Sequence, residues 1–125
     1  MLVDSDVLIW GTRGHASALA AINALNPMHL SVVSYMELAQ GCRNKAELKQ
    51  LKKGLSLLQA VIEPLDETTS ALAADLIDTY ALSHSLRVSD ALIAATAMTR
   101  SLTLLTGNDK HFSQIKGLAV QVFRP

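Results

Sequence analysis

Short apolar runs that alternate with helical stretches constrain the fold of this chain more than any other feature. Buried strands are predicted at residues 2–3, 30–33, 61–62, 102–106 and 119–123. Helices are predicted at residues 16–25, 34–41, 45–60, 67–82 and 90–99. This alternation is typical of an α/β domain with a mostly parallel sheet of four to five strands. A chain of 125 residues is the length of one domain, so residues 1–125 are expected to form a single unit.

Capping residues predict where several of these helices begin and end. Ser34 and Glu37 match the S-x-x-E capping box that starts a helix. Asp66 and Ser89 are candidate N-caps of the next two long helices. The pair Asn26-Pro27 is expected to stop the helix before it.

Composition narrows the class of protein. Half of the residues are apolar and the 11 basic residues balance the 11 acidic ones, which excludes an intrinsically disordered chain. The single cysteine, Cys42, excludes a disulfide scaffold and suits a reducing compartment. Asp4 and Asp6 interrupt the start of the chain where a signal peptide would be apolar, and no apolar run is long enough to span a membrane. We therefore expect a cytoplasmic protein with no membrane partner.

Acidic residues follow the predicted strands or begin the helices after them. Asp4 follows the first strand, Glu37 lies in the helix after the second, and Asp109 follows the strand that ends at Thr106. Asp90 lies in the first turn of a helix. Since ligands bind at the carboxyl ends of parallel strands, these side chains are expected to converge there. Crowded carboxylates are tolerated when a divalent cation neutralises them, and oxygen ligands favour Mg²⁺ or Mn²⁺.

Each acid also has a structural interpretation. Glu37 is the last residue of the capping box, Asp90 complements a helix dipole, and Asp109 suits a Gly-Asn-Asp turn. Asp6 is interpreted as a helix cap rather than as an acid that supports the site. Asp4 is the hardest to explain structurally, because an acid between apolar residues is buried and needs a partner.

Four segments together resemble the motifs of PIN-domain ribonucleases. They are LVDSDVLI at residues 2–9, SYMEL at 34–38 followed by Gly41, SDALIAATA at 89–97 and LTGNDKHF at 105–112. The third is the most specific, and the four occur in the family's order over the whole chain. The subgroup with this pattern and length is the VapC-type toxins of toxin–antitoxin pairs.

The resemblance implies a three-layer α/β/α fold and an endoribonuclease that depends on Mg²⁺ or Mn²⁺. Asp4, Glu37 and Asp90 match the metal-binding acids of the family, which hold a metal-activated water that hydrolyses RNA phosphodiester bonds. The resemblance also implies a homodimer and a cognate antitoxin whose C-terminal segment covers the active site.

The fourth motif departs from the family pattern. The family often has Thr-x-Asp or Thr-x-Asn, whereas this chain has Thr106-Gly107-Asn108 and the acid is displaced to Asp109. We predict that Asp109 supplies a fourth catalytic carboxylate; the alternative is that Asn108 completes the site.

Two other functions compete with the nuclease. One is a non-catalytic PIN-like module that binds RNA or protein. The other is a haloacid-dehalogenase-type phosphatase with Asp4 as nucleophile, but such enzymes need paired downstream acids, and Asp90 is followed by Ala91-Leu92. The sequence leaves open which RNA and which bond are cut, whether one or two metal ions bind, and the identity of the antitoxin.

Overall fold

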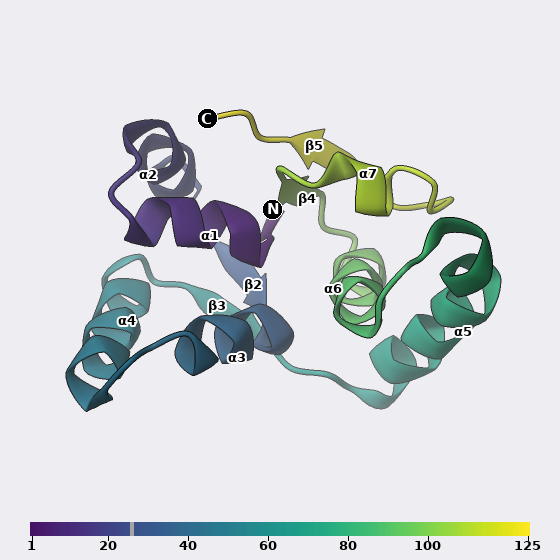
Figure 1. The fold of residues 1–125 in the computed structure, drawn as a ribbon, viewed down its shortest axis with the longest axis horizontal. Helices are drawn as coiled ribbons and strands as arrows, with labels where there is room; N and C mark the ends of the chain where they lie inside the picture. The colour runs from purple at the N-terminus through teal and green to yellow at the C-terminus, as the bar shows by residue number, and fades with distance from the viewer. Residues whose placement is uncertain (26) are drawn as a thin grey trace.

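One parallel sheet organises the fold. The computed structural model describes residues 1–25 and 27–125, and within them five strands pair in the order β3-β2-β1-β4-β5 (Figure 1). Every pairing is parallel. The elements in chain order are β1 (Leu2–Val3), α1 (Ser5–Thr12), α2 (Ala16–Asn23), β2 (His29–Ser31), α3 (Val32–Gln40), α4 (Lys45–Leu57), β3 (Val61–Glu63), α5 (Glu67–His84), α6 (Val88–Thr99), β4 (Leu104–Thr106), α7 (Asp109–Phe112) and β5 (Val120–Val122).

The two faces of the sheet carry separate hydrophobic cores. Leu2 and Leu104 point to one face, where residues of α5, α6 and α7 cover them. Val3 and Leu105, the next residue of each strand, point to the other face, where α1, α2 and α4 cover them. Because successive side chains of a strand alternate between faces, the central strands β1 and β4 are buried on both sides, whereas the edge strands β3 and β5 are partly exposed. The arrangement confirms the predicted three-layer α/β/α fold.

The starts of α3 and α6 differ from the predictions. Ser31 is the N-cap of α3, and its side chain accepts a hydrogen bond of 3.1 Å from Val33 N. The predicted capping box at Ser34 is therefore wrong, and Glu37 lies in the second turn, free of that structural role. Helix α6 begins at Val88 with Arg87 as N-cap, so Ser89 lies inside the helix rather than at its cap. The Asp66 cap is confirmed by a bond of 2.8 Å from Thr69 N.

Helix α1 is absent from the sequence-based prediction. Its N-cap is Asp4, whose Oδ1 accepts a hydrogen bond from Ser5 N, so the prediction that Asp6 is the cap is wrong. Helix α2 ends at Asn23, and the predicted stop at Asn26-Pro27 includes residue 26, which lies outside the described residues. Among the described residues, no helix is both long and apolar enough to cross a membrane.

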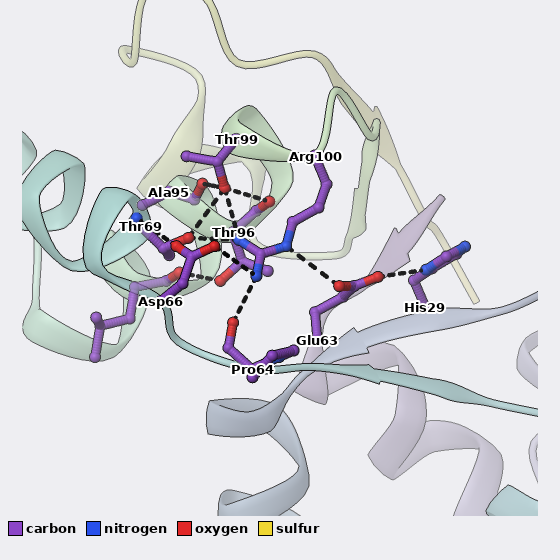
Figure 2. A network of polar contacts seen from close by, with 10 residues as sticks. His29, Glu63, Pro64, Asp66, Thr69, Ala95, Thr96, Thr99 and Arg100 are labelled. Carbon is purple, nitrogen blue, oxygen red and sulfur yellow. Dashed lines mark hydrogen bonds and ion pairs between the residues drawn. The ribbon is translucent and has the colours of Figure 1, made fainter.

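Arg100 ties the end of α6 to β3 and to the start of α5 (Figure 2). Its Nε donates to Glu63 Oε2 at 3.2 Å, and Nη2 donates to the carbonyl of Pro64 at 2.6 Å. Nη1 donates to the hydroxyls of Thr69 and Thr99. The other carboxylate oxygen of Glu63 lies 2.8 Å from His29 Nδ1. The side chains of Arg100 and Glu63 are only 18% and 16% exposed. The Arg100 guanidinium therefore compensates the charge of a largely buried Glu63 carboxylate.

Replacing Arg100 by Gln is expected to lower the free energy of unfolding by about 2–3 kcal/mol, because Glu63 then keeps a largely buried charge with fewer donors. The matched control is Arg43→Gln. Arg43 pairs with Glu47 at 2.8 Å but is 85% exposed, and such surface pairs contribute about 0–1 kcal/mol. Urea denaturation of both variants measures the two effects; equal losses would show that the Arg100 network adds nothing beyond a surface pair.

Candidate active site

The carboxyl ends of β1 and β4 meet at the candidate site. Asp4 directly follows β1 and is buried, and Thr106 is the last residue of β4. Thr106 Oγ1 donates to Asp4 Oδ2 at 2.8 Å, while Ser5 N donates to Asp4 Oδ1 at 2.8 Å. The backbone of Asp4 is also part of the sheet, since its N–H donates to the Leu105 carbonyl. Asp4 is therefore held at the sheet edge with both carboxylate oxygens oriented by donors.

A serine links Asp4 to the next acid. Ser5 Oγ lies 3.3 Å from Glu37 Oε1 and 3.4 Å from Asp4 Oδ1, so one hydroxyl stands between the two carboxylates. Glu37 reaches this position from α3, which follows β2 directly at the same edge of the sheet. The predicted pair of Asp4 and Glu37 thus converges in the structure.

Asp90, the third acid singled out in the sequence, lies in the first turn of α6. Its negative charge is one of the causes that raise the pKa of Asp4, which places it within electrostatic reach of that carboxylate. The Asp90 side chain is only 15% exposed, and its Oδ2 lies 3.6 Å from His111 Nδ1. Of the acids singled out in the sequence, Asp4 and Glu37 are therefore joined through Ser5, and Asp90 lies in the first turn of α6 with His111 as its contact.

Asp6 belongs to the same group, contrary to its interpretation as a cap. Its Oδ1 accepts from Val7 N at 2.7 Å, and its Oδ2 accepts from Gly107 N at 2.9 Å. The second bond joins α1 to the loop after β4. The available sequence signal was the D-x-D spacing of Asp4 and Asp6, but the loop partner is a backbone amide 101 residues away, which no local pattern reveals.

Asp109 is placed differently from the other predicted acids. Its carboxylate accepts a hydrogen bond of 2.9 Å from Arg124 Nη2, and this guanidinium lowers the pKa of Asp109 below its ordinary value. No hydrogen bond described for Asp4, Glu37 or Asp90 involves Asp109. Asn108, the alternative, contributes its backbone N–H, which donates to Thr106 Oγ1 at 3.0 Å. Neither residue is drawn into the group around Asp4 by the contacts of the described residues.

Burial and charge both act on Asp4. Burial raises its pKa from 3.8 to about 6, with a further contribution from the charge of Asp6 and a smaller one from Asp90. Hydrogen bonds from Thr106 and Ser5 act in the opposite direction. Burial also raises the pKa of Asp6. Burial, together with the charge of Asp6, thus disfavours the charged form of Asp4, which is the situation a bound cation relieves.

The donor set fits a hard divalent cation. Asp4, Glu37 and Asp90 offer carboxylate oxygens, which are the ligands that hard divalent cations prefer. Among the residues described, however, no three His, Cys, Asp or Glu side chains already stand close enough together to enclose a metal ion. The site therefore supplies oriented oxygens around Asp4 rather than a closed cage.

The raised pKa of Asp4 predicts an unusual pH dependence for the metal-free protein. Because the folded state binds the Asp4 proton more tightly than the unfolded chain does, folding takes up a proton between about pH 4 and pH 6. Lowering the pH from 7 to 5 should therefore stabilise the metal-free protein through Asp4, by about 1–2 kcal/mol at about 1.4 kcal/mol per pKa unit. The measurement is urea denaturation at each pH with EDTA, for the wild type and for Asp4→Asn.

The variant lacks the titrating carboxyl, so the difference between the two proteins isolates the contribution of Asp4. We expect that difference to be largest at pH 7 and to shrink towards pH 5. A difference that does not change with pH would contradict the raised pKa.

A groove of about 890 Å³ runs between α1, α2, α3 and α4, and Glu37 forms part of its lining. Its buried apolar residues are Leu8, Ile22, Leu38 and Leu55. Ile9 and Leu19 line it as well and remain about 40% exposed. An apolar groove with exposed large side chains is typical of a surface that binds another protein.

Comparison with known proteins gives one consistent result. The family model described as PIN domain matches residues 1–118. Ribonuclease VapC10 of Mycobacterium tuberculosis, in both the CDC 1551 and the H37Rv strains, is 37% identical over 122 residues, which cover 94% of this chain and 90% of the relative.

Solved structures agree with this result. The toxin–antitoxin complex from Klebsiella pneumoniae contains a chain with TM-score 0.80 and 27% identity, and the match covers 94% of each chain. VapBC2 from Rickettsia felis, bound to a DNA fragment from its promoter, contains a chain with the same TM-score and 20% identity over 98% of each chain; this second likeness concerns the fold.

Proposed function

Because the chain belongs to the PIN-domain family, we propose that it is the endoribonuclease toxin of a toxin–antitoxin pair. The observation that carries the proposal is the contact of two acids, Asp4 and Glu37, through Ser5 at one edge of the sheet. Asp4 is buried there, Glu37 meets it through Ser5, and the charge of Asp90 acts on it from α6. The 37% identity to a ribonuclease over 94% of the chain supports the same activity.

We propose that Asp4, Glu37 and Asp90 hold a divalent cation, either Mg²⁺ or Mn²⁺. When bound, such an ion supplies an acidified water as nucleophile and neutralises charge that develops on the phosphate. The protein contributes the orientation of the oxygens: Thr106 and Ser5 fix the Asp4 carboxylate, and the Ser5 hydroxyl sets the separation between Asp4 and Glu37. Asp109, whose carboxylate is paired with Arg124, is left out of this ligand set.

The substrate we propose is RNA, approached from the side where cationic side chains flank the acids. In α7, His111 lies 3.6 Å from Asp90 and the exposed Lys110 precedes it in the chain, while the exposed Arg87 immediately precedes α6. Exposed cations beside a carboxylate group attract the phosphates that the acids themselves would repel. Because the net charge of the chain is zero, attraction of RNA to the site depends on these local charges rather than on the overall charge of the protein.

The partner we propose is a cognate antitoxin, because the structural neighbour from Klebsiella pneumoniae is a toxin–antitoxin complex. We propose that an apolar segment of the antitoxin occupies the groove between α1 and α4. The exposed Ile9 and Leu19 would then become buried. Because Glu37 belongs to both the groove and the acidic group, a segment lying in the groove would end at the active site.

Cleavage of RNA by the purified chain, free of antitoxin, tests the proposal. Total bacterial RNA is incubated with Mg²⁺ or Mn²⁺, with and without EDTA, and the products are mapped at their ends. We expect discrete fragments in the presence of metal and none with EDTA. A folded protein that binds metal but cuts no RNA would favour a non-catalytic module instead, and release of phosphate from small phosphomonoesters would favour a phosphatase.

A further inference from the structure

We propose that Arg124 is a positioning residue for the acidic site, acting through the loop of residues 107–109. This inference rests on the proposed function, because it concerns the carboxylates that we assign to metal binding. Arg124 contacts none of Asp4, Glu37 and Asp90 in the hydrogen bonds of the described residues. Its contacts are with the loop that sets the position of Asp4 and Asp6.

The inner side of this loop orients two carboxylates. Gly107 N donates to Asp6 Oδ2 at 2.9 Å. Asn108 N donates to Thr106 Oγ1 at 3.0 Å, and that hydroxyl in turn donates to Asp4 Oδ2 at 2.8 Å. A shift of the loop backbone would therefore move a hydrogen bond of Asp6 directly and one of Asp4 through Thr106.

The outer side of the loop is held by Arg124. Nη1 donates to the carbonyl of Gly107 at 3.0 Å, and Nη2 donates to Asp109 Oδ1 at 2.9 Å. Gly107 is thus fixed on both sides, its N–H by Asp6 and its C=O by Arg124. A planar guanidinium suits this role because its donors have a fixed geometry and can hold two acceptors at once.

The backbone before Arg124 keeps the guanidinium in place. Phe123 is buried in the core that also contains Val3 and Leu105, and its N–H donates to the carbonyl of Thr106 at 2.8 Å. The residue next to Arg124 is therefore anchored to the last residue of β4. The Arg124 side chain is 63% exposed, but the backbone that carries it is held to the sheet through Phe123.

The competing explanation is that Arg124 only neutralises Asp109 at the surface. Two variants separate the explanations. Arg124→Gln removes the donors to both Gly107 and Asp109, whereas Asp109→Asn removes the ion pair but leaves the bond from Arg124 to the Gly107 carbonyl. Arg124→Lys restores one charged donor and tests whether a conservative replacement rescues the function.

The experiment is titration of the full-length protein with Mn²⁺ by calorimetry, accompanied by hydrogen exchange of the peptide that contains Gly107. Loss of a residue that orients metal ligands typically costs about 10–100-fold in affinity, and Arg124 acts one step further out, so we expect the Kd of Arg124→Gln to rise about three- to tenfold. Exchange at the Gly107 peptide should accelerate. Arg124→Lys should recover part of the affinity, and Asp109→Asn should stay closer to the wild type than Arg124→Gln does.

Arg43→Gln serves as the control, because it breaks the surface ion pair between Arg43 and Glu47 at the start of α4. This variant should leave the Mn²⁺ affinity unchanged. If the wild type binds Mn²⁺ and Arg124→Gln binds it equally well, the positioning role is wrong. An equal loss of Mn²⁺ affinity in Asp109→Asn would also overturn the positioning role, because loss of the Arg124–Asp109 ion pair alone would then explain the effect of Arg124→Gln. If the wild type binds no Mn²⁺, the proposed function fails first.

Discussion

The Asp4→Asn variant is expected to cleave RNA about 10²–10³-fold more slowly than the wild type, a loss typical of removing one electrostatic stabiliser from an active site. Asp4 is the buried acid that Ser5 joins to Glu37, and Asp90 is the third acid proposed for the site. Asn keeps the size of the side chain and can still accept from Ser5 N, so the N-cap of α1 is preserved. The loss should therefore reflect the missing charge rather than a missing fold.

The same substitution should make the metal-free protein more stable at pH 7. Burial and the charge of Asp6 disfavour the ionised form of Asp4, and a neutral amide avoids this cost. A variant that loses activity while its denaturation midpoint rises is difficult to explain by misfolding. Parallel measurements of cleavage and of urea denaturation with EDTA test both directions.

Asp78→Asn is the matched control for this variant. Asp78 is exposed on α5, so the same Asp-to-Asn change is made there on the surface, away from the sheet edge. Its cleavage rate and stability should equal those of the wild type. If Asp4→Asn cleaves RNA as fast as Asp78→Asn, Asp4 is not a catalytic residue and the assignment of the site is wrong.

The Gly107→Ala variant should lose both stability and cleavage. A Cβ at this position would lie 2.8 Å from Asp6 Oδ2 and 3.4 Å from the carbonyl of Phe123. The carboxylate cannot simply rotate away, because Val7 N and Gly107 N both hold it. We expect the free energy of unfolding to fall by about 2–3 kcal/mol from overpacking and a lost buried hydrogen bond. Cleavage should slow by about 10–100-fold as the loop shifts.

Gly54→Ala is the control for this glycine. Position 54 lies within α4, and a Cβ there would meet no atom within 4 Å. Because alanine favours the helix, this variant should gain up to about 1 kcal/mol of stability. Thermal or urea denaturation of the two variants, with cleavage assays alongside, makes the comparison. Equal stability of Gly107→Ala and the wild type would show that the loop has room to spare.

Much of the fold could be predicted because parallel strands and amphipathic helices leave strong local patterns. The apolar pairs Leu2-Val3 and Leu104-Leu105 are buried on both faces, so they appear as continuous apolar runs. Asp66 caps α5 by a bond that spans three residues, which a sequence pattern reveals directly. The proximity of Asp4 and Glu37, which Ser5 joins, followed from the rule for strand ends.

The remaining features depend on contacts that no local pattern contains. The apolar run Val7-Leu8-Ile9 does not show helical spacing clearly, and α1 is a helix because Asp4 caps it and the sheet packs against it. Ser31 rather than Ser34 caps α3 because β2 ends there, which is a property of the sheet. The bonds of Gly107 to Asp6 and to Arg124 join segments 101 and 17 residues apart.

The most direct test of the central claim is a crystal structure of the protein with Mn²⁺, in which anomalous scattering locates the ion. We predict one anomalous peak, or two adjacent peaks, at the carboxyl ends of β1 and β4. The ion should lie within coordination distance of carboxylate oxygens of Asp4 and Asp90, with Glu37 facing it. A peak that instead lies on Asp109, away from Asp4, would contradict the account. So would the absence of any peak at the sheet edge under saturating Mn²⁺.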